Sequence, residues 1–291
     1  TTDGGATWDK IHNGLPEGTL GRIALAVSPV KPYHLYAVVE ARESALYRSS
    51  DHGSSWEKMS SQYMMSDRPF YYSLLVADPT DADRIYKPGT MLWVSTDGGK
   101  VFQSPSVTGG SYHSDTHALW INPEDNSFMY MGTDGGVYIS EDRGNSWRFV
   151  PSLPLSQFYH VSVDDKSPYN VYGGLQDNGS WMGPSKKPGG VTNADWKNVG
   201  YGDGFYTYVD KTDPDIIYSQ YQGGRINRIN IKTGESKYIK PFPAEGTENL
   251  RFNWNTPTVF GKKSGWLYVG AQYLYRSTDR GDTFARISPD I

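Results

Sequence analysis

The sequence predicts an all-β fold, a β-propeller of four-stranded antiparallel blades with seven blades in the complete ring. Two patterns that repeat with one period of 42 to 50 residues carry this prediction. Aromatic residues make up 14% of the chain, which also has 32 Gly and 18 Pro. Such a composition is typical of many short strands joined by tight turns.

The first pattern is an eight-residue phrase with a hydroxyl residue first, Asp third, Gly fifth and an aromatic residue eighth. It occurs as "TTDGGATW", "SSDHGSSW", "STDGGKVF", "SEDRGNSW" and "STDRGDTF". It follows strands such as "ALYRS" and precedes strands such as "WEKM", which predicts the turn between the third and fourth strands of a blade. Because Asp accepts backbone N–H groups in turns and Gly supplies a conformation that other residues resist, we interpret the phrase as structural. Its aspartates are Asp3, Asp51, Asp97, Asp142 and Asp279.

The phrase is missing twice between its last two copies, which lie three periods apart. The stretch "NIKTGESK" keeps the frame but has Lys232 in place of Asp. Near "SKKPGGVTNADW" an insertion has erased the phrase altogether.

The second pattern is a hydrophobic strand, a turn that often contains Pro, and another strand that carries Tyr, as in "LAVSPVKPYHLYAV". It predicts the first two strands of each blade, because it precedes the phrase with the same period. Its tyrosines are Tyr36, Tyr86, Tyr130, Tyr172, Tyr218 and Tyr268.

Together the two patterns predict one propeller domain over residues 1–291. A half blade occupies 1–17, and full blades occupy 18–67, 68–112, 113–157, 158–200, 201–250 and 251–291. A half blade is completed by strands from elsewhere, which removes exposed strand edges. We therefore expect the chain to be a fragment, or a mature product, of a longer protein.

The composition excludes several functional classes. The 28 basic and 32 acidic residues give a net charge of −4, which does not favour nucleic acid or an anionic membrane as a partner. The sequence shows no signal peptide and no apolar run of 18 residues, so direct membrane insertion is not expected. The chain has no Cys, so disulfides, thiolate metal sites and cysteine nucleophiles are ruled out.

One face of the propeller gathers the unusual polar residues. Turns between second and third strands, and crossings between blades, share this face and hold three of the six His residues. Loops on a rigid scaffold are where binding residues gather, so we expect recognition here. The alternative is that polar loops simply solvate the rim.

The sharpest constellation is His113, Asp115 and His117 in "YHSDTHALW". On an extended strand the three side chains would point to the same side. They could bind a transition metal or form an acid and base pair, or Asp115 could simply hold both imidazoles by hydrogen bonds. Apart from this candidate metal ion, we expect no cofactor.

Three further stretches of the same face could bind a ligand. In "GGLQDNGSW" the carboxamides and carboxylate suit hydroxyl-rich ligands, although Asp-Asn-Gly also favours a hairpin. In "YGDGFY" a carboxylate lies between aromatic residues, and "RFNWNTP" combines an aromatic face with amides, although Trp254 could instead be core packing. With Arg68 from "SDRPFYY", the ligand-binding candidates are Arg68, His113, His117, Gln176, Asn178, Tyr201, Arg251, Asn253 and Trp254, and the catalytic candidates are Asp115, Asp177 and Asp203.

The phrase resembles the Asp-box, or bacterial neuraminidase repeat. The ordered segments "RPFYYS", "HALW", "GTDGGVYIS", "QFYHVSVD", "PYNVYGGLQDNGSW", "GDGFY", "GGRI" and "RFNWNTP" resemble a group of exported bacterial Asp-box proteins, described as sortilin N-terminal-like or as glycosyl hydrolases. This resemblance implies a secreted or periplasmic propeller in which the Asp-box is structural.

Related families imply different activities. Sialidases need an arginine cluster and a Tyr and Glu pair, and their early arginine motif is absent, although Arg68, Arg225 and Arg251 could meet. Xyloglucanases of the twin-propeller kind use two aspartates that face each other across two propellers, for which Asp115, Asp177 and Asp203 are candidates on one side. Sortilins carry a cysteine-rich module, which this chain lacks. Photosystem assembly factors are Asp-box propellers that act by binding proteins.

We therefore expect an extracytoplasmic recognition or scaffolding module that binds a protein or glycan partner through the loop-rich face. The first alternative is a glycoside hydrolase with an acid and base carboxylate pair on that face. A further alternative is a metal-dependent site at His113, Asp115 and His117.

Overall fold

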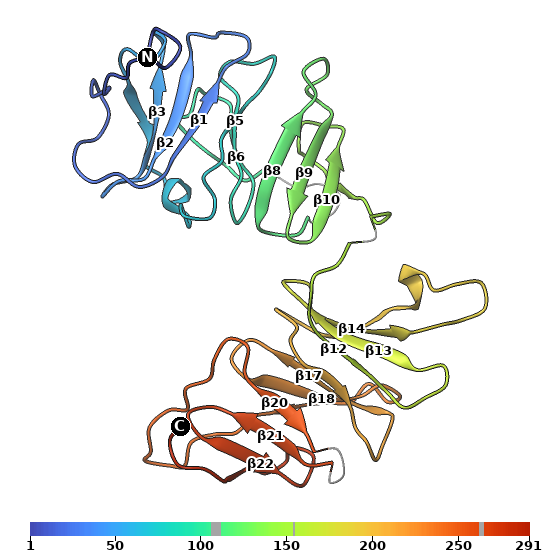
Figure 1. Cartoon of the computed structure of the whole chain (residues 1–291). Coiled ribbons are helices and arrows are strands. Elements are labelled where there is room, and N and C mark those ends of the chain that lie inside the picture. The colour runs from blue at the N-terminus through green and yellow to red at the C-terminus, as the bar shows by residue number, and fades with distance from the viewer. Residues whose placement is uncertain (106–111, 154, 262–264) are drawn as a thin grey trace. The chain divides into compact units, whose positions relative to one another are not determined.

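The computed structural model describes residues 1–105, 112–153, 155–261 and 265–291 (Figure 1). Within these residues all regular elements are β-strands except two short 3₁₀ turns, as the sequence predicts. The chain divides into two compact units, residues 1–153 and 154–291, which we call unit 1 and unit 2 and describe separately. No helix in the described ranges is long and apolar enough to cross a membrane.

The described part of unit 1 contains three antiparallel sheets. The first is formed by β1 (Ile23–Val27), β2 (Leu35–Val39), β3 (Ala45–Ser49) and β4 (Glu57–Ser60), followed by the 3₁₀ turn η1 (Tyr63–Ser66). The second is formed by β5 (Val76–Ala77), β6 (Ile85–Lys87) and β7 (Trp93–Ser95), with a single bridge from Val94 to Gln103 in place of a fourth strand. The third is formed by β8 (Thr116–Ile121), β9 (Met129–Thr133), β10 (Gly136–Ser140) and β11 (Arg148–Phe149).

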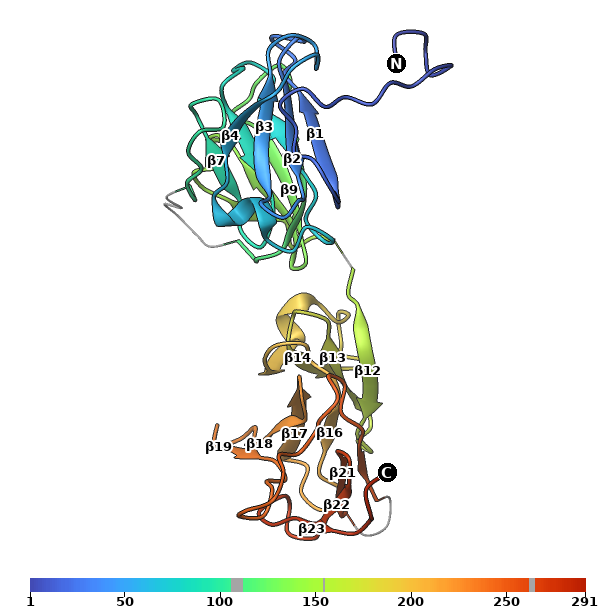
Figure 2. The same ribbon diagram turned by 90° about the vertical axis from the view of Figure 1, so that its left-hand side faces the viewer.

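The described part of unit 2 also contains three sheets, each of four strands (Figure 2). The first is formed by β12 (Phe158–Val163), β13 (Asn170–Leu175), β14 (Ser180–Pro184) and β15 (Lys197–Gly200), with the 3₁₀ turn η2 (Asn193–Asp195) before β15. The second is formed by β16 (Thr207–Val209), β17 (Ile216–Tyr221), β18 (Arg225–Asn230) and β19 (Ser236–Ile239). The third is formed by β20 (Thr258–Phe260), β21 (Leu267–Gly270), β22 (Leu274–Ser277) and β23 (Ala285–Arg286).

In each sheet neighbouring strands are consecutive in the chain and antiparallel, which is the meander of a propeller blade. The fold is therefore that of a multi-bladed β-propeller. Each of the six ranges expected for full blades contains one of these sheets. Residues 1–22 contain no strand, so the half blade at 1–17, the seventh blade and the single domain stay predictions.

Four of the six tyrosines of the second pattern pack between successive blades. Tyr36 and Tyr86 in unit 1, and Tyr172 and Tyr218 in unit 2, are fully buried, and each is followed by another blade in its own unit. The hydroxyl of Tyr36, for example, donates to the backbone oxygen of Ala82 in the next blade at 2.8 Å. Tyr130 lies in the last blade of unit 1 and is exposed. A tyrosine of this pattern is thus fully buried where a further blade of the same unit packs against its own blade.

After β3, β10 and β22 the eight-residue phrase forms the turn between the third and fourth strands, and we call the phrase the repeated turn in all its copies. In the turn after β10, Ser140 Oγ donates to Asp142 Oδ1 and accepts the Gly144 N–H, both at 2.8 Å. Asp142 Oδ1 accepts the Ser146 N–H at 2.8 Å, and its Oδ2 accepts the Ser146 hydroxyl at 2.6 Å. The Trp147 indole N–H closes the turn on the Gly144 oxygen at 3.1 Å. The same aspartate contacts recur at Asp3, Asp51 and Asp279, whereas Asp97 accepts two backbone N–H groups and the Ser95 hydroxyl.

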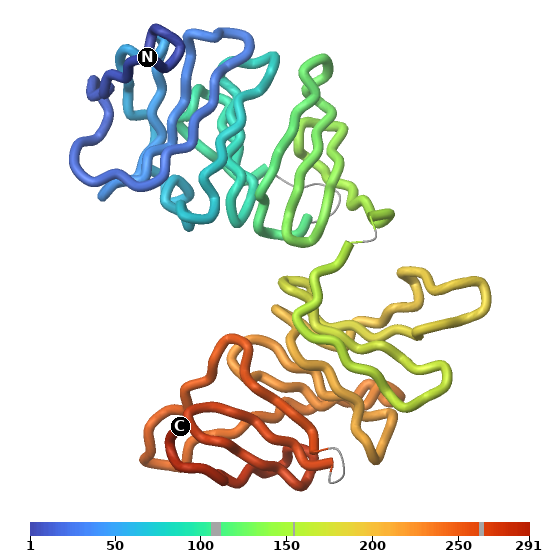
Figure 3. Tube along the Cα trace, in the orientation of Figure 1, coloured from blue at the N-terminus to red at the C-terminus, as the bar shows by residue number. Residues whose placement is uncertain are grey.

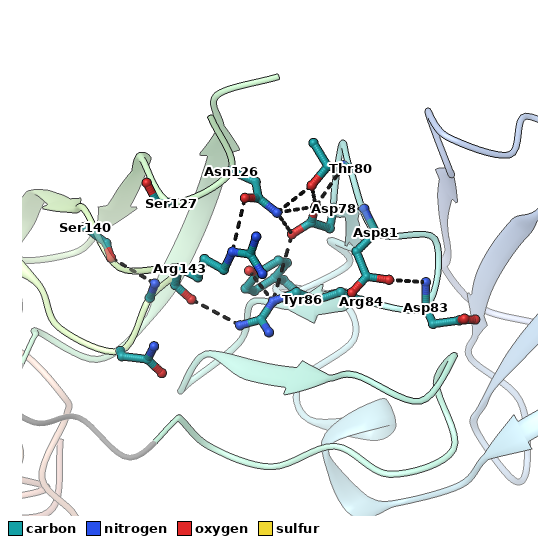
Figure 4. Close-up of polar contacts among 12 residues, drawn as sticks. Asp78, Thr80, Asp81, Asp83, Arg84, Tyr86, Asn126, Ser127, Ser140 and Arg143 are labelled. Atoms are coloured by element: carbon teal, nitrogen blue, oxygen red, sulfur yellow. Dashed lines mark hydrogen bonds and ion pairs between the residues drawn. The ribbon is translucent and has the colours of Figure 1, made fainter. Parts of the chain in front are cut away.

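A polar network on this side of unit 1 joins the second blade to the third (Figure 4). Asp78, in the turn after β5, is completely buried, and its carboxylate accepts the amide N–H groups of Asn126 at 2.9 and 3.1 Å. Asn126 also donates to Thr80 Oγ1 at 2.6 Å, and its own oxygen accepts Arg143 Nε at 3.1 Å. Arg143 belongs to the repeated turn, so that turn is tied to the preceding blade.

Unit 2 repeats this link. Arg280, in the repeated turn after β22, lies 3.4 Å from the buried carboxylate of Asp210 and donates to Thr212 Oγ1 at 2.9 Å. Arg228 on β18 donates to the backbone oxygen of Arg280 at 2.9 Å. In both networks the buried carboxylates of Asp78 and Asp210 are therefore occupied in joining neighbouring blades.

Candidate functional site

The crossings and the turns between second and third strands form two clusters, one in each unit. The unit 1 cluster consists of Arg68, Tyr71, Tyr72, Asp115, His117 and Asp134. The unit 2 cluster consists of His160, Asp177, Asp203, Tyr206, Trp254 and Asn255.

In the unit 1 cluster Asp115 is held by hydroxyl groups. The Tyr72 hydroxyl donates to its Oδ1, and the Ser114 hydroxyl donates to Oδ2 at 2.7 Å. Burial, and then the hydrogen bond to Asp115, raise the pKa of Tyr72, so the phenol stays a donor. Arg68 Nη1 lies 3.7 Å from Asp115 Oδ1, and its guanidinium stacks 5.1 Å from the centre of the Tyr71 ring. The cluster therefore presents a half-buried carboxylate beside an exposed cation and an aromatic ring.

The second half of the unit 1 cluster is a histidine and carboxylate pair. His117 Nε2 lies 3.0 Å from Oδ1 of Asp134, which follows β9, and both side chains are partly exposed. The Tyr71 ring meets the imidazole edge to face, with 4.8 Å between ring centres. Sequence reasoning singled out His117 and missed Asp134, because "TDGG" predicts only a hairpin turn.

The candidate metal site at His113, Asp115 and His117 is not formed. No group of three or more His, Cys, Asp or Glu side chains in the described ranges is arranged to hold a metal ion. The prediction required an extended strand, but Asp115 has φ of +64°, and β8 begins one residue later at Thr116. The three side chains therefore do not follow the alternation of an extended strand and do not point to one side. The imidazole of His113 contacts the Ser114 backbone oxygen at 2.9 Å, whereas His117 contacts Asp134.

In the unit 2 cluster Asp203 joins two other candidates. Its Oδ1 accepts the backbone N–H of Asp177 at 2.8 Å, and its Oδ2 accepts the Trp254 indole N–H at 2.9 Å. Asp203 is only 5% exposed, so a carboxylate with one hydrogen bond on each oxygen lies beneath the surface. Each oxygen keeps a second lone pair, but burial limits the access of a ligand to this carboxylate.

Trp254 is 60% exposed, which excludes the alternative that it is core packing. Its backbone N–H donates to Asn253 Oδ1 at 2.9 Å, and its backbone oxygen accepts the Gly223 N–H at 3.0 Å. Together with the bond to Asp203, these contacts hold the indole in place while leaving its ring open to solvent. An exposed aromatic ring that is fixed in this way is suited to stack on a ligand.

A row of stacked rings lies beside Trp254. His160, on β12, stacks on Tyr206 with 3.9 Å between ring centres and 11° between planes, and Tyr206 continues onto Tyr208 at 5.7 Å. The amide of Asn255 lies 3.0 Å from His160 Nε2, and the buried Asn255 Oδ1 has no hydrogen-bond partner. Sequence reasoning did not select His160, Tyr206 or Asn255. The signal available was the aromatic content of the crossings "QFYH" and "GFYTY".

The remaining candidates have local roles. Gln176 Oε1 accepts the Gln157 amide at 2.7 Å, and Asn178 donates to the Gln176 backbone oxygen at 2.8 Å, so both brace the β13–β14 turn. Arg251 forms exposed ion pairs of 3.3 Å with Glu248 and Asp290 and points to neither cluster's carboxylates. Tyr201 is largely exposed in the crossing before Asp203.

Comparison with known proteins gives sequence relatives but no family model that matches. The chain is 27% identical over 288 residues to xyloglucanase Xgh74A of Acetivibrio thermocellus, covering 91% of this chain and 32% of that protein. It is 25% identical over 340 residues to a xyloglucanase of Hypocrea jecorina, covering 97% and 35%. By sequence, the chain is similar to xyloglucanases. It spans between 23% and 35% of the length of these curated relatives.

Solved structures with some likeness include the GH74 xyloglucanase from Xanthomonas campestris, with a TM-score of 0.36, 16% identity and coverage of 92% of this chain and 38% of that one. YCF48 from Cyanidioschyzon merolae has a TM-score of 0.31 and 17% identity, with coverage of 91% and 84%.

Proposed function

We propose that the chain is the glycan-binding propeller of an exported, glycoside hydrolase-like Asp-box protein, and that its ligand is a xyloglucan-like polysaccharide. The single observation that carries the proposal is the exposed Trp254 ring, whose indole N–H is anchored on the buried Asp203. The negative face of such a ring attracts the C–H groups of a sugar ring. The sugar class comes from the xyloglucanases that the chain resembles in sequence.

The groups around Trp254 support the same ligand class. Asn255 and Asn253 bring amides, and His160 and Tyr206 bring stacked rings, to the same crossing region. Amides both donate and accept, so they suit hydroxyl groups, which also do both.

Affinity electrophoresis and titration calorimetry with xyloglucan and its oligosaccharides test this proposal. We expect the wild type to bind and Trp254→Ala to weaken binding about fivefold, because stacking on a fixed ring is worth about 1 kcal/mol. Trp8→Ala is the matched control, since Trp8 is an exposed tryptophan of unit 1 whose indole N–H bonds within its own turn. Binding that Trp254→Ala leaves unchanged refutes the site. Absence of any glycan binding, together with retention of a protein partner, supports the scaffolding role instead.

Hydrolysis is the second candidate, and the unit 1 cluster favours it. Asp115 and Asp134 are two partly exposed carboxylates in one cluster, and a glycosidase needs a pair of carboxyl groups about 5 to 9.5 Å apart. The test is release of reducing ends from xyloglucan by the full chain. If the chain is a hydrolase, Asp115→Asn or Asp134→Asn should lower kcat at least 100-fold with binding retained. Equal turnover in wild type and both variants would exclude these two residues.

A further inference from the structure

An open depression lies on unit 2 between the β12–β13 turn and the segment that follows β14. It has a cavity volume of about 720 Å³ and is lined by Ser167, Pro168, Tyr169, Ser185, Lys186, Lys187 and Pro188. Such a volume is in the range of small-molecule sites. The neighbouring loops that form it can be followed in the Cα trace of Figure 3.

The depression occurs where the repeated turn is absent. Residues 185–196 separate β14 from β15, whereas residues 50–56 suffice between β3 and β4. The longer segment is held by its own contacts. The Thr192 N–H donates to Asp195 Oδ2 at 2.8 Å, Lys187 Nζ pairs with Asp195 Oδ1, and the Ser185 N–H donates to the Tyr169 oxygen at 2.9 Å. The insertion therefore replaces the repeated turn with a longer segment that is held by its own contacts and forms one side of the depression.

The depression's walls combine a flat apolar surface with polar groups. Tyr169 is 47% exposed, and the lining also includes two prolines, which have no backbone N–H to satisfy. The hydroxyls of Ser167 and Ser185 can each donate and accept a hydrogen bond. A pyranose ring matches this combination, because it has apolar C–H groups on its faces and hydroxyls at its edge.

The charge of the depression favours an anionic glycan over a neutral one. Lys187 is neutralised by Asp195, but Lys186 forms no ion pair within the described residues. The lining thus includes one ammonium group that no carboxylate of the described residues neutralises. An anionic ligand would pair with this group more strongly than a neutral one, and a sugar ring carries negative charge as a carboxylate.

We propose that this depression binds a uronic acid residue of an acidic glycan, with the sugar ring on Tyr169 and its carboxylate paired with Lys186. The site is independent of the one at Trp254. Tyr169 precedes β13, and the Asp177 turn follows it, so the six residues of β13 separate the two places by about 20 Å.

Titration calorimetry of the full chain with trigalacturonic acid tests this proposal at low and at physiological salt. We expect Tyr169→Ala to weaken binding about tenfold and Lys186→Gln to weaken it about threefold to fivefold, more at low salt. Lys232→Gln is the matched control, because Lys232 is exposed in the corresponding turn of the next blade. Trp254→Ala should leave trigalacturonate binding unchanged, which separates this site from the proposed xyloglucan site.

Three results would overturn the proposal. One is absence of trigalacturonate binding by the wild type, and another is binding that neither Tyr169→Ala nor Lys186→Gln weakens. The third is equal affinity for a neutral cello-oligosaccharide of the same length, which would show that Lys186 does not select for a negatively charged sugar. Circular dichroism and urea unfolding of each variant establish that the fold is intact.

Discussion

The indole N–H of Trp254 donates to Oδ2 of Asp203 at 2.9 Å, and this bond joins an exposed ring to a buried carboxylate. The two residues are 51 positions apart and come from crossings into consecutive blades. Oδ1 of the same carboxylate accepts the backbone N–H of Asp177 at 2.8 Å. Asp203 therefore links the β13–β14 turn to the Trp254 crossing. It also helps to orient the Trp254 ring, although a ligand that stacks on the ring need not contact Asp203.

Asp203→Asn should loosen Trp254 and lower stability. An amide places an N–H₂ group where the carboxylate had an acceptor, so one buried donor loses its partner, at a cost of about 1–3 kcal/mol. We expect the free energy of unfolding in urea to fall by that amount and xyloglucan affinity to fall as well. Asp165→Asn, at an exposed ion pair with Lys211 in the same unit, is the control. If Asp203→Asn binds and unfolds like the wild type, Asp203 does not position Trp254.

The sequence was sufficient to predict the blades because their signals are local. The phrase around Asp142 contains all six residues that bond within its turn, so its role follows from short-range chemistry. The site was harder to predict, because its contacts join distant crossings. Asp203 and Trp254 were both candidates on one face, but the bond between them depends on how blades stack.

The failed metal site has a related cause. Alternation places His113, Asp115 and His117 on one side only if the backbone between them is extended. The positive φ of Asp115 breaks that condition, and "YHSDTHALW" does not signal it, because even Asp, which is enriched at positive φ, adopts it in a small minority of cases. Asp134 was missed for the opposite reason, since its turn sequence already had a sufficient structural explanation.

Asp142→Ala should lower stability without changing ligand binding. The substitution removes an acceptor for the Ser146 N–H and for two hydroxyls, which resembles the loss of a helix cap, at about 1–2 kcal/mol. Urea unfolding measures this, and Glu141→Ala at the neighbouring exposed position should change it by less than about 0.5 kcal/mol. A loss of glycan affinity in a folded Asp142→Ala protein would contradict a purely structural turn.

The repeated turns should also make the protein sensitive to strong acid. Hydrogen bonds from Ser55 and Ser49 lower the pKa of Asp51 to about 2, and those from Thr283 and Ser277 lower that of Asp279 to about 2, from 3.8. Because these pKa values are depressed in the folded state, their stabilisation is present above pH 3.8 and is lost as the pH falls towards 2. We expect the unfolding temperature to fall across this window. The fall should be shallower in the Asp51→Asn, Asp279→Asn double variant, and an identical slope would argue against this origin.

Lys87 should make stability rise with pH in the alkaline range, as the turn aspartates do in the acid range. It is 1% exposed, and burial lowers its pKa to about 8 from 10.5, although Asp67 acts in the opposite direction. Its ammonium donates to the backbone oxygens of Tyr72 at 3.0 Å and Pro88 at 2.8 Å, beneath the unit 1 cluster.

Between these two pKa values the unfolded chain binds more protons than the folded one, so stability rises with pH from about 8 to 10, by at most about 3 kcal/mol. Lys87→Met should abolish this rise in urea unfolding measured over that range. Lys211→Met, at an exposed ion pair, should retain it. A wild-type slope that persists in Lys87→Met would assign the titration to another group. A slope of opposite sign would mean that the two carbonyl contacts hold the Lys87 proton more strongly than burial releases it.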